Sequence, residues 1–195
     1  MNTYLPSQQS NQTRNQIRHQ MREVRHRLTT FEQQQAERCI TEKALNLVEQ
    51  HGCQTVALYL SFDSEISTES LIKKLWQEKI NVTLPVLHPF SRGNLLFLKY
   101  QSDTIMQKNR YGILQPKLNV QNVVPLEQID IIFTPLVAFD KNGNRIGMGG
   151  GFYDRTLQHW QQKSFLPVGL AHRCQQLDNL PTEIWDIPLA MVLTD

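Results

Sequence analysis

Hydrophobic and polar positions alternate along the chain with two periods, and the changes of period divide it into helices and strands. Apolar residues recur at helical spacing within residues 14–28, and again after the capping-box pair Thr29 and Glu32 as far as Gly52. A third helical pattern covers residues 67–79. The first stretch predicts an amphipathic helix with a cationic edge, formed by Arg14, Arg18, Arg22 and Arg25.

Runs of β-branched and apolar residues between the helical patterns indicate buried strands. The most apolar run is residues 129–139, as expected of a central strand. A fourth helix is expected over residues 152–163. Interleaved strands and helices predict an α/β fold: one layered domain with a mixed, mostly parallel central sheet flanked by helices. The other expected strands are residues 55–62, 80–87, 94–100, 165–171 and 189–195.

Length and composition restrict the class of protein. The chain of 195 residues fits one domain, which we expect at 14–195, after a polar, disordered leader at 1–13. No run approaches the roughly 18 apolar residues of a membrane span, and the N-terminus lacks the apolar centre of a signal peptide. We therefore expect a cytoplasmic protein without membrane contact. The widely spaced Cys39, Cys53 and Cys174 indicate neither a disulfide framework nor a zinc site.

The stretch NRIGMGGGFYDR, residues 144–155, places four glycines in five positions between an expected strand and an expected helix. Open α/β sheets bind ligands at such places, and glycines there can present backbone N–H groups to an anion. Arg145 can pair with a phosphate, and Asp154 can hold Mg²⁺. The pattern is neither GxGxxG, because Phe152 stands where glycine is needed, nor GxxxxGK[ST], because lysine is absent. A flexible turn is the alternative interpretation.

The segment FDKNGNRIGMGGGFYDR, with LYLSFDSEISTESLI before it and PVGLAHRCQQLDNLPTEIWDIPLAMVLT after it, resembles the 5-formyltetrahydrofolate cyclo-ligase family, also called 5,10-methenyltetrahydrofolate synthetase. The resemblance runs from about Arg14 to the C-terminus and implies an NagB/RpiA-like α/β fold. It implies conversion of 5-formyltetrahydrofolate to 5,10-methenyltetrahydrofolate, ADP and phosphate with ATP and Mg²⁺. ATP phosphorylates the formyl oxygen, the folate's 10-nitrogen attacks the activated carbon, and phosphate leaves. Such chemistry needs positioning and charge stabilisation more than a protein nucleophile.

The resemblance assigns site residues to several parts of the chain. Arg145 and Tyr153 are the catalytic candidates, and Asp154 and Asp186 are the Mg²⁺ ligands. Glu65 accepts hydrogen bonds from the pterin. The full folate-binding set is Leu60, Glu65, Met148, Gly149, Gly150, Gly151 and Phe152. The ATP-binding set is Arg14, Arg18, Arg145, Ile146, Gly147, Met148, Gly149, Gly150, Gly151, Phe152 and Tyr153.

Each assignment outside the glycine stretch has a structural alternative. The arginines of the first helix can form a solvated stripe, and Glu65 can favour the start of the helix that follows it. Asp186, in the sequence WDIP, can simply stabilise a turn through its side chain.

Histidines and large aromatic residues receive structural roles by the same reasoning. His88 and His172 lack a partner at motif spacing, so they are expected to be structural or surface groups. Trp160 and Trp185 are expected to pack. An apolar pterin pocket is expected to use Phe62, Phe90 and Tyr111.

Two other classes of function stay open at this point. A nucleic-acid-binding module would explain the arginine helix, but a net charge of +2 with dispersed acids argues against nucleic acid as a partner. A sugar-phosphate isomerase or acyl-CoA transferase of related fold could use a glycine-rich phosphate loop without ATP hydrolysis. We expect a monomer with a small-molecule folate substrate.

Overall fold

A seven-stranded sheet forms the centre of the molecule. The computed structural model describes residues 8–195, with side chains from Thr13 onward. In spatial order its strands are β11 (Met191–Thr194), β10 (Leu166–Ala171), β7 (Ile131–Pro135), β1 (Thr55–Ala57), β2 (Asn81–Leu87), β3 (Leu95–Lys99) and β6 (Val123–Val124). The pairs from β11 through β10, β7 and β1 to β2 are parallel, whereas β2–β3 and β3–β6 are antiparallel, so the predicted mixed, mostly parallel sheet is confirmed.

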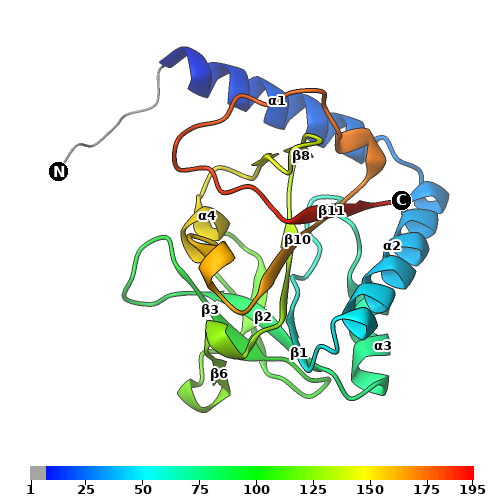
Figure 1. Cartoon of the computed structure of the whole chain (residues 1–195), viewed down its shortest axis with the longest axis vertical. Coiled ribbons are helices and arrows are strands. Elements are labelled where there is room, and N and C mark those ends of the chain that lie inside the picture. The colour runs from blue at the N-terminus through cyan, green and yellow to red at the C-terminus, as the bar shows by residue number, and fades with distance from the viewer. Residues whose placement is uncertain (1–7) are drawn as a thin grey trace.

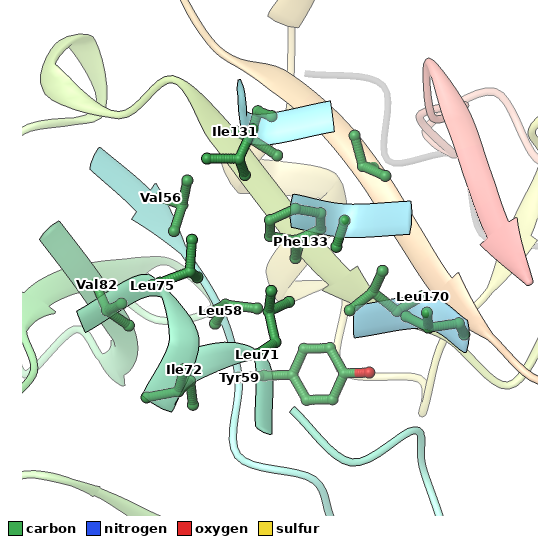
Figure 2. Packing of buried hydrophobic residues seen from close by; sticks show 14 of the residues in the cluster. Val56, Leu58, Tyr59, Leu71, Ile72, Leu75, Val82, Ile131, Phe133 and Leu170 are labelled. Carbon is green, nitrogen blue, oxygen red and sulfur yellow. The ribbon is translucent and has the colours of Figure 1, made fainter. Parts of the chain in front are cut away.

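Helices cover the sheet because each buries an apolar stripe. In Figure 1, α2 (Thr30–Gln50) and α3 (Glu69–Gln77) lie along one face, and α1 (Gln8–His26) crosses one end of the sheet. Figure 2 shows the core on that face, where Leu71 and Leu75 of α3 lie close to Val56, Phe133 and other apolar side chains of the strands. The capping box predicted at the start of α2 is present. None of the helices in the described part of the chain is long and apolar enough to cross a membrane.

Two predicted elements are shorter than expected. The strand expected over 55–62 ends at Ala57, because the carbonyl of Tyr59 accepts a hydrogen bond from the Thr68 hydroxyl instead of pairing with a strand. The helix expected over 152–163 is only the five residues of α4 (Phe152–Thr156). A left-handed residue, His159 at φ 59°, follows and leads into a 3₁₀ turn at Trp160–Gln162.

The N-terminal boundary also differs from the prediction. α1 begins at Gln8, so residues 8–13, expected in the disordered leader, are helical. The rest of that expected leader, residues 1–7, lies outside the described residues.

The apolar run 129–139 divides into two strands. After β7, the chain enters the hairpin of β8 (Ala138–Phe139) and β9 (Arg145–Ile146). Buried Asp140 closes this hairpin by accepting hydrogen bonds from the Asn142 and Asn144 backbone N–H groups at 2.9 and 3.1 Å. The glycine stretch therefore follows a hairpin strand and not the central strand itself.

The remaining elements are short and lie at the margins. A second hairpin joins β4 (Met106–Lys108) to β5 (Leu114–Pro116). Three further 3₁₀ turns cover Val120–Asn122, Leu126–Gln128 and Arg173–Gln175.

Candidate active site

A cavity of about 1130 Å³ opens beside the point where the strand order reverses. From β1 the chain adds β2 on one side, whereas β7, β10 and β11 follow on the other. Tyr59 and Leu60, just beyond β1, and Pro135 and Leu136, at the end of β7, line the cavity. Open α/β sheets bind ligands at this position, beyond the carboxyl ends of the strands on either side of the reversal.

Nearly all of the predicted site residues line this one cavity. They come from the first helix, the segment after β1, the glycine stretch and the segment before β11, and they are Arg14, Arg18, Leu60, Glu65, Arg145, Gly147, Met148, Gly149, Gly150, Gly151, Phe152, Tyr153, Asp154 and Asp186. Ile146 is the exception. Its side chain is fully buried against Met21, Val137 and Ala138, where it anchors the glycine stretch to the body of the protein.

The glycine stretch presents backbone donors to the cavity. Within the described residues, the N–H groups of Met148, Gly149 and Gly150 have no hydrogen-bond acceptor. Gly149 lies at φ +100° and Gly151 at φ +64°, in the left-handed region that glycine adopts without strain. A chain segment with three unpaired N–H groups beside arginines provides the kind of surface that binds phosphate oxygens.

Arginines hold the carbonyl groups of the same stretch. Arg18 donates from Nε to the Gly147 carbonyl at 2.8 Å. Arg155 donates to the Gly150 carbonyl and, at 2.8 Å, to the Gly93 carbonyl of the β2–β3 loop. Burial and the neighbouring Arg14 lower the pKa of Arg18. The stretch is therefore fixed from both sides through its carbonyl oxygens, while the N–H groups of Met148, Gly149 and Gly150 have no acceptor among the described residues.

A buried ion pair lies at the base of the stretch. The Arg145 side chain, 3% exposed, donates from Nη2 to Asp154 Oδ1 at 2.8 Å, and from Nη1 to the Ile187 carbonyl. Burial lowers the pKa of Arg145, and the adjacent carboxylates of Asp154 and Asp186 counteract that shift. Asp154 accepts both of its hydrogen bonds at Oδ1, the second from the Ile187 N–H at 3.4 Å. Among the described residues its Oδ2 has no hydrogen-bond donor, so this oxygen can take a ligand.

A second arginine–carboxylate pair joins the two ends of the chain. Arg14 donates to both oxygens of Asp186, at 3.0 Å from Nη2 to Oδ1, and also to the Pro181 carbonyl. Asp186 Oδ2 additionally accepts the Glu183 N–H at 2.8 Å. The hydrogen bond to Asp186 raises the pKa of Arg14. Both carboxylate oxygens of Asp186 are engaged, in contrast to those of Asp154.

An acid and two tyrosines form the inner wall. Burial raises the pKa of Glu65 to about 7, against the opposing effect of Arg25. Glu65 Oε2 accepts the Phe62 N–H at 3.1 Å. Burial, and then the nearby Glu65 carboxylate, raise the pKa values of Tyr59 and Tyr153. Near neutral pH the wall therefore offers hydroxyl donors and a carboxyl group that can change protonation state.

The segment that carries Glu65 is fastened to α1 by Asp63. This carboxylate accepts hydrogen bonds from Arg22 at 2.7 and 2.9 Å, from Arg25 at 2.7 Å, and pairs with His26 at 2.9 Å. Asp63 and Ser64 both lie in the left-handed region, at φ 55° and 58°. The cationic edge of the first helix therefore divides: its first two arginines face the cavity, and its last two bind this turn.

Some aromatic assignments need correction. Trp185, expected to pack, is 40% exposed and lines the cavity, whereas Trp160 packs in the core as predicted. Phe62 and Tyr111 line the cavity as predicted, but Phe90 is 93% exposed and does not. The position of Trp185 next to Asp186 was the one sequence signal for its place in the cavity wall.

Two further polar residues change the picture of the site. Arg155, which the site prediction omitted, contacts the glycine stretch, and it immediately follows Asp154 in the sequence. His172 is buried away from the cavity, and burial lowers its pKa.

The geometry brings backbone N–H donors, arginines and a partly buried acid together in one cavity. Comparison with known proteins identifies the family: residues 10–195 match the model of the 5-formyltetrahydrofolate cyclo-ligase family, and the chain belongs to it. A 5-formyltetrahydrofolate cyclo-ligase of Haemophilus influenzae is 62% identical over 182 residues, covering 93% of this chain and 97% of that protein. The Escherichia coli K12 enzyme of the same name is 49% identical over 174 residues, covering 89% and 96%.

Solved structures agree in fold. An NMR structure of the 5,10-methenyltetrahydrofolate synthetase of Aquifex aeolicus superposes with a TM-score of 0.78 at 28% identity, covering 93% of this chain and 89% of that one. A 5,10-methenyltetrahydrofolate synthetase of Mycoplasma pneumoniae gives a TM-score of 0.73 at 24% identity, covering 92% and 96%.

Proposed function

We propose that the chain is an ATP- and Mg²⁺-dependent ligase that cyclises 5-formyltetrahydrofolate to 5,10-methenyltetrahydrofolate, releasing ADP and phosphate. The observation that carries this proposal is that the unpaired N–H groups of Met148, Gly149 and Gly150 line the same cavity as Glu65. One cavity thus combines an anion-binding wall with an acceptor for pterin N–H groups. Membership of the cyclo-ligase family supports the reaction.

The residues present fit an ATP-bound Mg²⁺ ion. Mg²⁺ in such sites usually takes one or two carboxylates together with phosphate oxygens and water, so it needs no all-protein cage. The described residues contain no cluster of three or more His, Cys, Asp or Glu that would form one. Asp154 has a free oxygen at the cavity wall, whereas Asp186 uses both of its oxygens to hold Arg14 and the Glu183 N–H. We therefore assign the metal to Asp154 first, and Asp186 joins it only if Arg14 shifts toward a phosphate.

The chain's own residues position the reacting groups. Bound ATP supplies the phosphoryl group that turns the formyl oxygen into a leaving group. Arg14, Arg18 and the glycine N–H groups neutralise the phosphate charge, and Arg145, fixed by Asp154, places a buried cation beside the transferred group. Tyr153 keeps its proton at neutral pH, because burial raises its pKa, and so acts as a hydrogen-bond donor that aligns the folate.

The direct test is incubation of the purified protein with 5-formyltetrahydrofolate, Mg²⁺ and ATP while the absorbance of methenyltetrahydrofolate is followed. ATP-dependent formation of the product is expected. Its absence from correctly folded protein would overturn the proposal. An isomerase or transferase of related fold would instead show no ATP requirement.

The role of Asp154 is tested by Asp154→Asn, which removes the charge and keeps the shape. We expect the Mg²⁺ concentration needed for half-maximal rate to rise at least tenfold, because a carboxylate ligand is lost. Asp103→Asn, at an exposed position outside the cavity, is the matched control. Equal Mg²⁺ dependence of the two variants would remove Asp154 from the metal site.

A further inference from the structure

A second, smaller pocket of about 320 Å³ adjoins the main cavity and has no assigned role. The two share Leu87, Asn109, Gln115 and Phe152, so a ligand can extend from one into the other. This side pocket is formed by the β2–β3 loop and the β4–β5 hairpin, away from α1. Its volume suits one small polar group at the end of a longer ligand.

Several hydrogen-bond donors line the side pocket, and none of the described residues in its wall is acidic. Arg92 and Arg110 are exposed at its rim, and neither forms an ion pair within the described residues. His88 accepts the N–H groups of Phe90 and Ser91 at Nδ1, at 3.2 and 2.9 Å. In neutral His88 the hydrogen is therefore on Nε2, which becomes a donor.

Gln115 adds a fourth donor. Its Oε1 accepts the Leu87 N–H and the Asn109 side-chain amide, both at 3.3 Å, so that its Nε2 group is the end left to donate. Two guanidinium groups, an imidazole N–H and an amide N–H in one hollow fit an anion with several acceptor oxygens, and carboxylates are such acceptors.

Aromatic side chains lie at the junction of the two pockets. Phe152 lines both, and its ring meets that of Tyr111 edge-on, with 6.2 Å between centroids. The Arg110 guanidinium lies 5.0 Å from the centroid of the Tyr111 ring, which holds the cation at this junction. The path from Glu65 to the side pocket therefore runs from an acceptor, past aromatic rings, to a cationic end.

A folate has the complementary sequence of groups: a pterin with N–H donors, an aromatic p-aminobenzoyl group, and a glutamate with carboxylates at the far end. We propose that the side pocket binds the glutamate carboxylates of the folate substrate, and that Arg92 and Arg110 are their principal partners. This inference rests on the proposed function. The phosphates of ATP are the other anions in the reaction, but they have their own cations in Arg14, Arg18 and Arg145, none of which lines the side pocket.

The experiment pairs truncation of the protein with truncation of the substrate. Steady-state KM values are measured for Arg92→Ala, Arg110→Ala and the double variant, with 5-formyltetrahydrofolate and with 5-formyltetrahydropteroate, which lacks the glutamate. Each single change should raise KM for the full substrate about fivefold, the factor for an exposed charge pair of about 1 kcal/mol. KM for the truncated substrate should rise much less, and KM for ATP should stay unchanged. Arg38→Ala, exposed on α2 and outside both pockets, is the matched control.

The outcomes separate the two proposals. An equal rise in KM with both folates, or a rise confined to ATP, overturns the side-pocket assignment. If no cyclisation is detected at all, the proposed reaction fails, and folate binding is then measured by quenching of tryptophan fluorescence without ATP. Weaker binding of the full substrate alone to the double variant still supports the side pocket, and unchanged binding overturns it.

Discussion

Replacement of Asp63 by asparagine should destabilise the protein strongly, because it removes the shared partner of two arginines and a histidine. The Asp63 side chain is 7% exposed and that of Arg25 is 0% exposed, so Arg25 would keep a buried charge without the carboxylate to which it donates. Loss of one partner from a buried pair costs about 3–5 kcal/mol. The side chains of Arg22 and His26 are 43% and 51% exposed, so the loss of their pairs with Asp63 adds little to the destabilisation. We therefore expect the free energy of unfolding to fall by about 3 kcal/mol, at the low end of that range. Asparagine tolerates the left-handed backbone at this position, so the change isolates the charge.

The assay is thermal unfolding followed by circular dichroism. For a chain of this length, ~3 kcal/mol corresponds to a fall in Tm of about 6–12 °C. Glu23→Gln is the control, because Glu23 is a carboxylate on α1 whose side chain is 53% exposed and, among the described residues, pairs with His19 and Arg27. It should leave Tm nearly unchanged. A fall for Asp63→Asn no larger than that of Glu23→Gln would refute the reasoning.

The stability difference between the wild type and Asp63→Asn should also depend on pH. Hydrogen bonds from Arg22 hold the pKa of Asp63 well below its usual range. A depressed pKa means that the carboxylate stabilises the folded state above its unfolded pKa, near 3.9, and that this contribution is lost as pH falls toward the folded value. The difference in Tm between wild type and Asp63→Asn should thus be full near pH 6–7 and shrink below about pH 4.

Two further predictions concern the acid of the cavity and one glycine. Since burial raises the pKa of Glu65 to about 7, kcat/KM for the folate should fall as pH drops below 7. Glu65→Gln should abolish this fall, and a pH profile of kcat/KM that keeps the same fall would exclude Glu65 as its source. Gly143→Ala should lower Tm by several degrees more than Gly112→Ala. Both glycines lie at φ near +80°, but a Cβ added at Gly143 would lie 2.5 Å from the Leu189 carbonyl oxygen, whereas one added at Gly112 would meet no atom of the described residues within 4 Å. Equal falls in Tm would refute this reasoning.

Local patterns predicted the parts of the fold that local forces determine. The capping box at Thr29 and the apolar spacing of α2 are properties of neighbouring residues, and both are confirmed. The division of residues 129–139 into two strands depends on distant groups. The carbonyls of Leu136 and Val137 accept hydrogen bonds from the side chain of Gln175, and the carbonyl of Leu136 also accepts one from Arg25. No pattern within the strand contains that information.

The site divides in the same way. The glycine stretch is contiguous, so its composition alone predicted an anion-binding segment, and three successive N–H groups in it, those of Met148, Gly149 and Gly150, have no acceptor among the described residues. The pairing of Arg14 with Asp186 was not predicted, because the two residues are 172 positions apart in the sequence. The role of Asp63 was missed for a similar reason, since its cations lie 37 to 41 residues earlier in the chain.

The contact of Arg14 with Asp186 also sets the order in which the site can be completed. During synthesis α1 emerges early, yet the carboxylate that neutralises Arg14 is made 172 residues later. Until then the helix has neither its ion-pair partner nor the Pro181 carbonyl that Arg14 also binds. Closure of so long a loop is entropically costly and slow. The strands from β1 to β10 can therefore pair before Arg14 meets its partner, and a nascent chain that ends before Asp186 would lack both that ion pair and the edge strand β11.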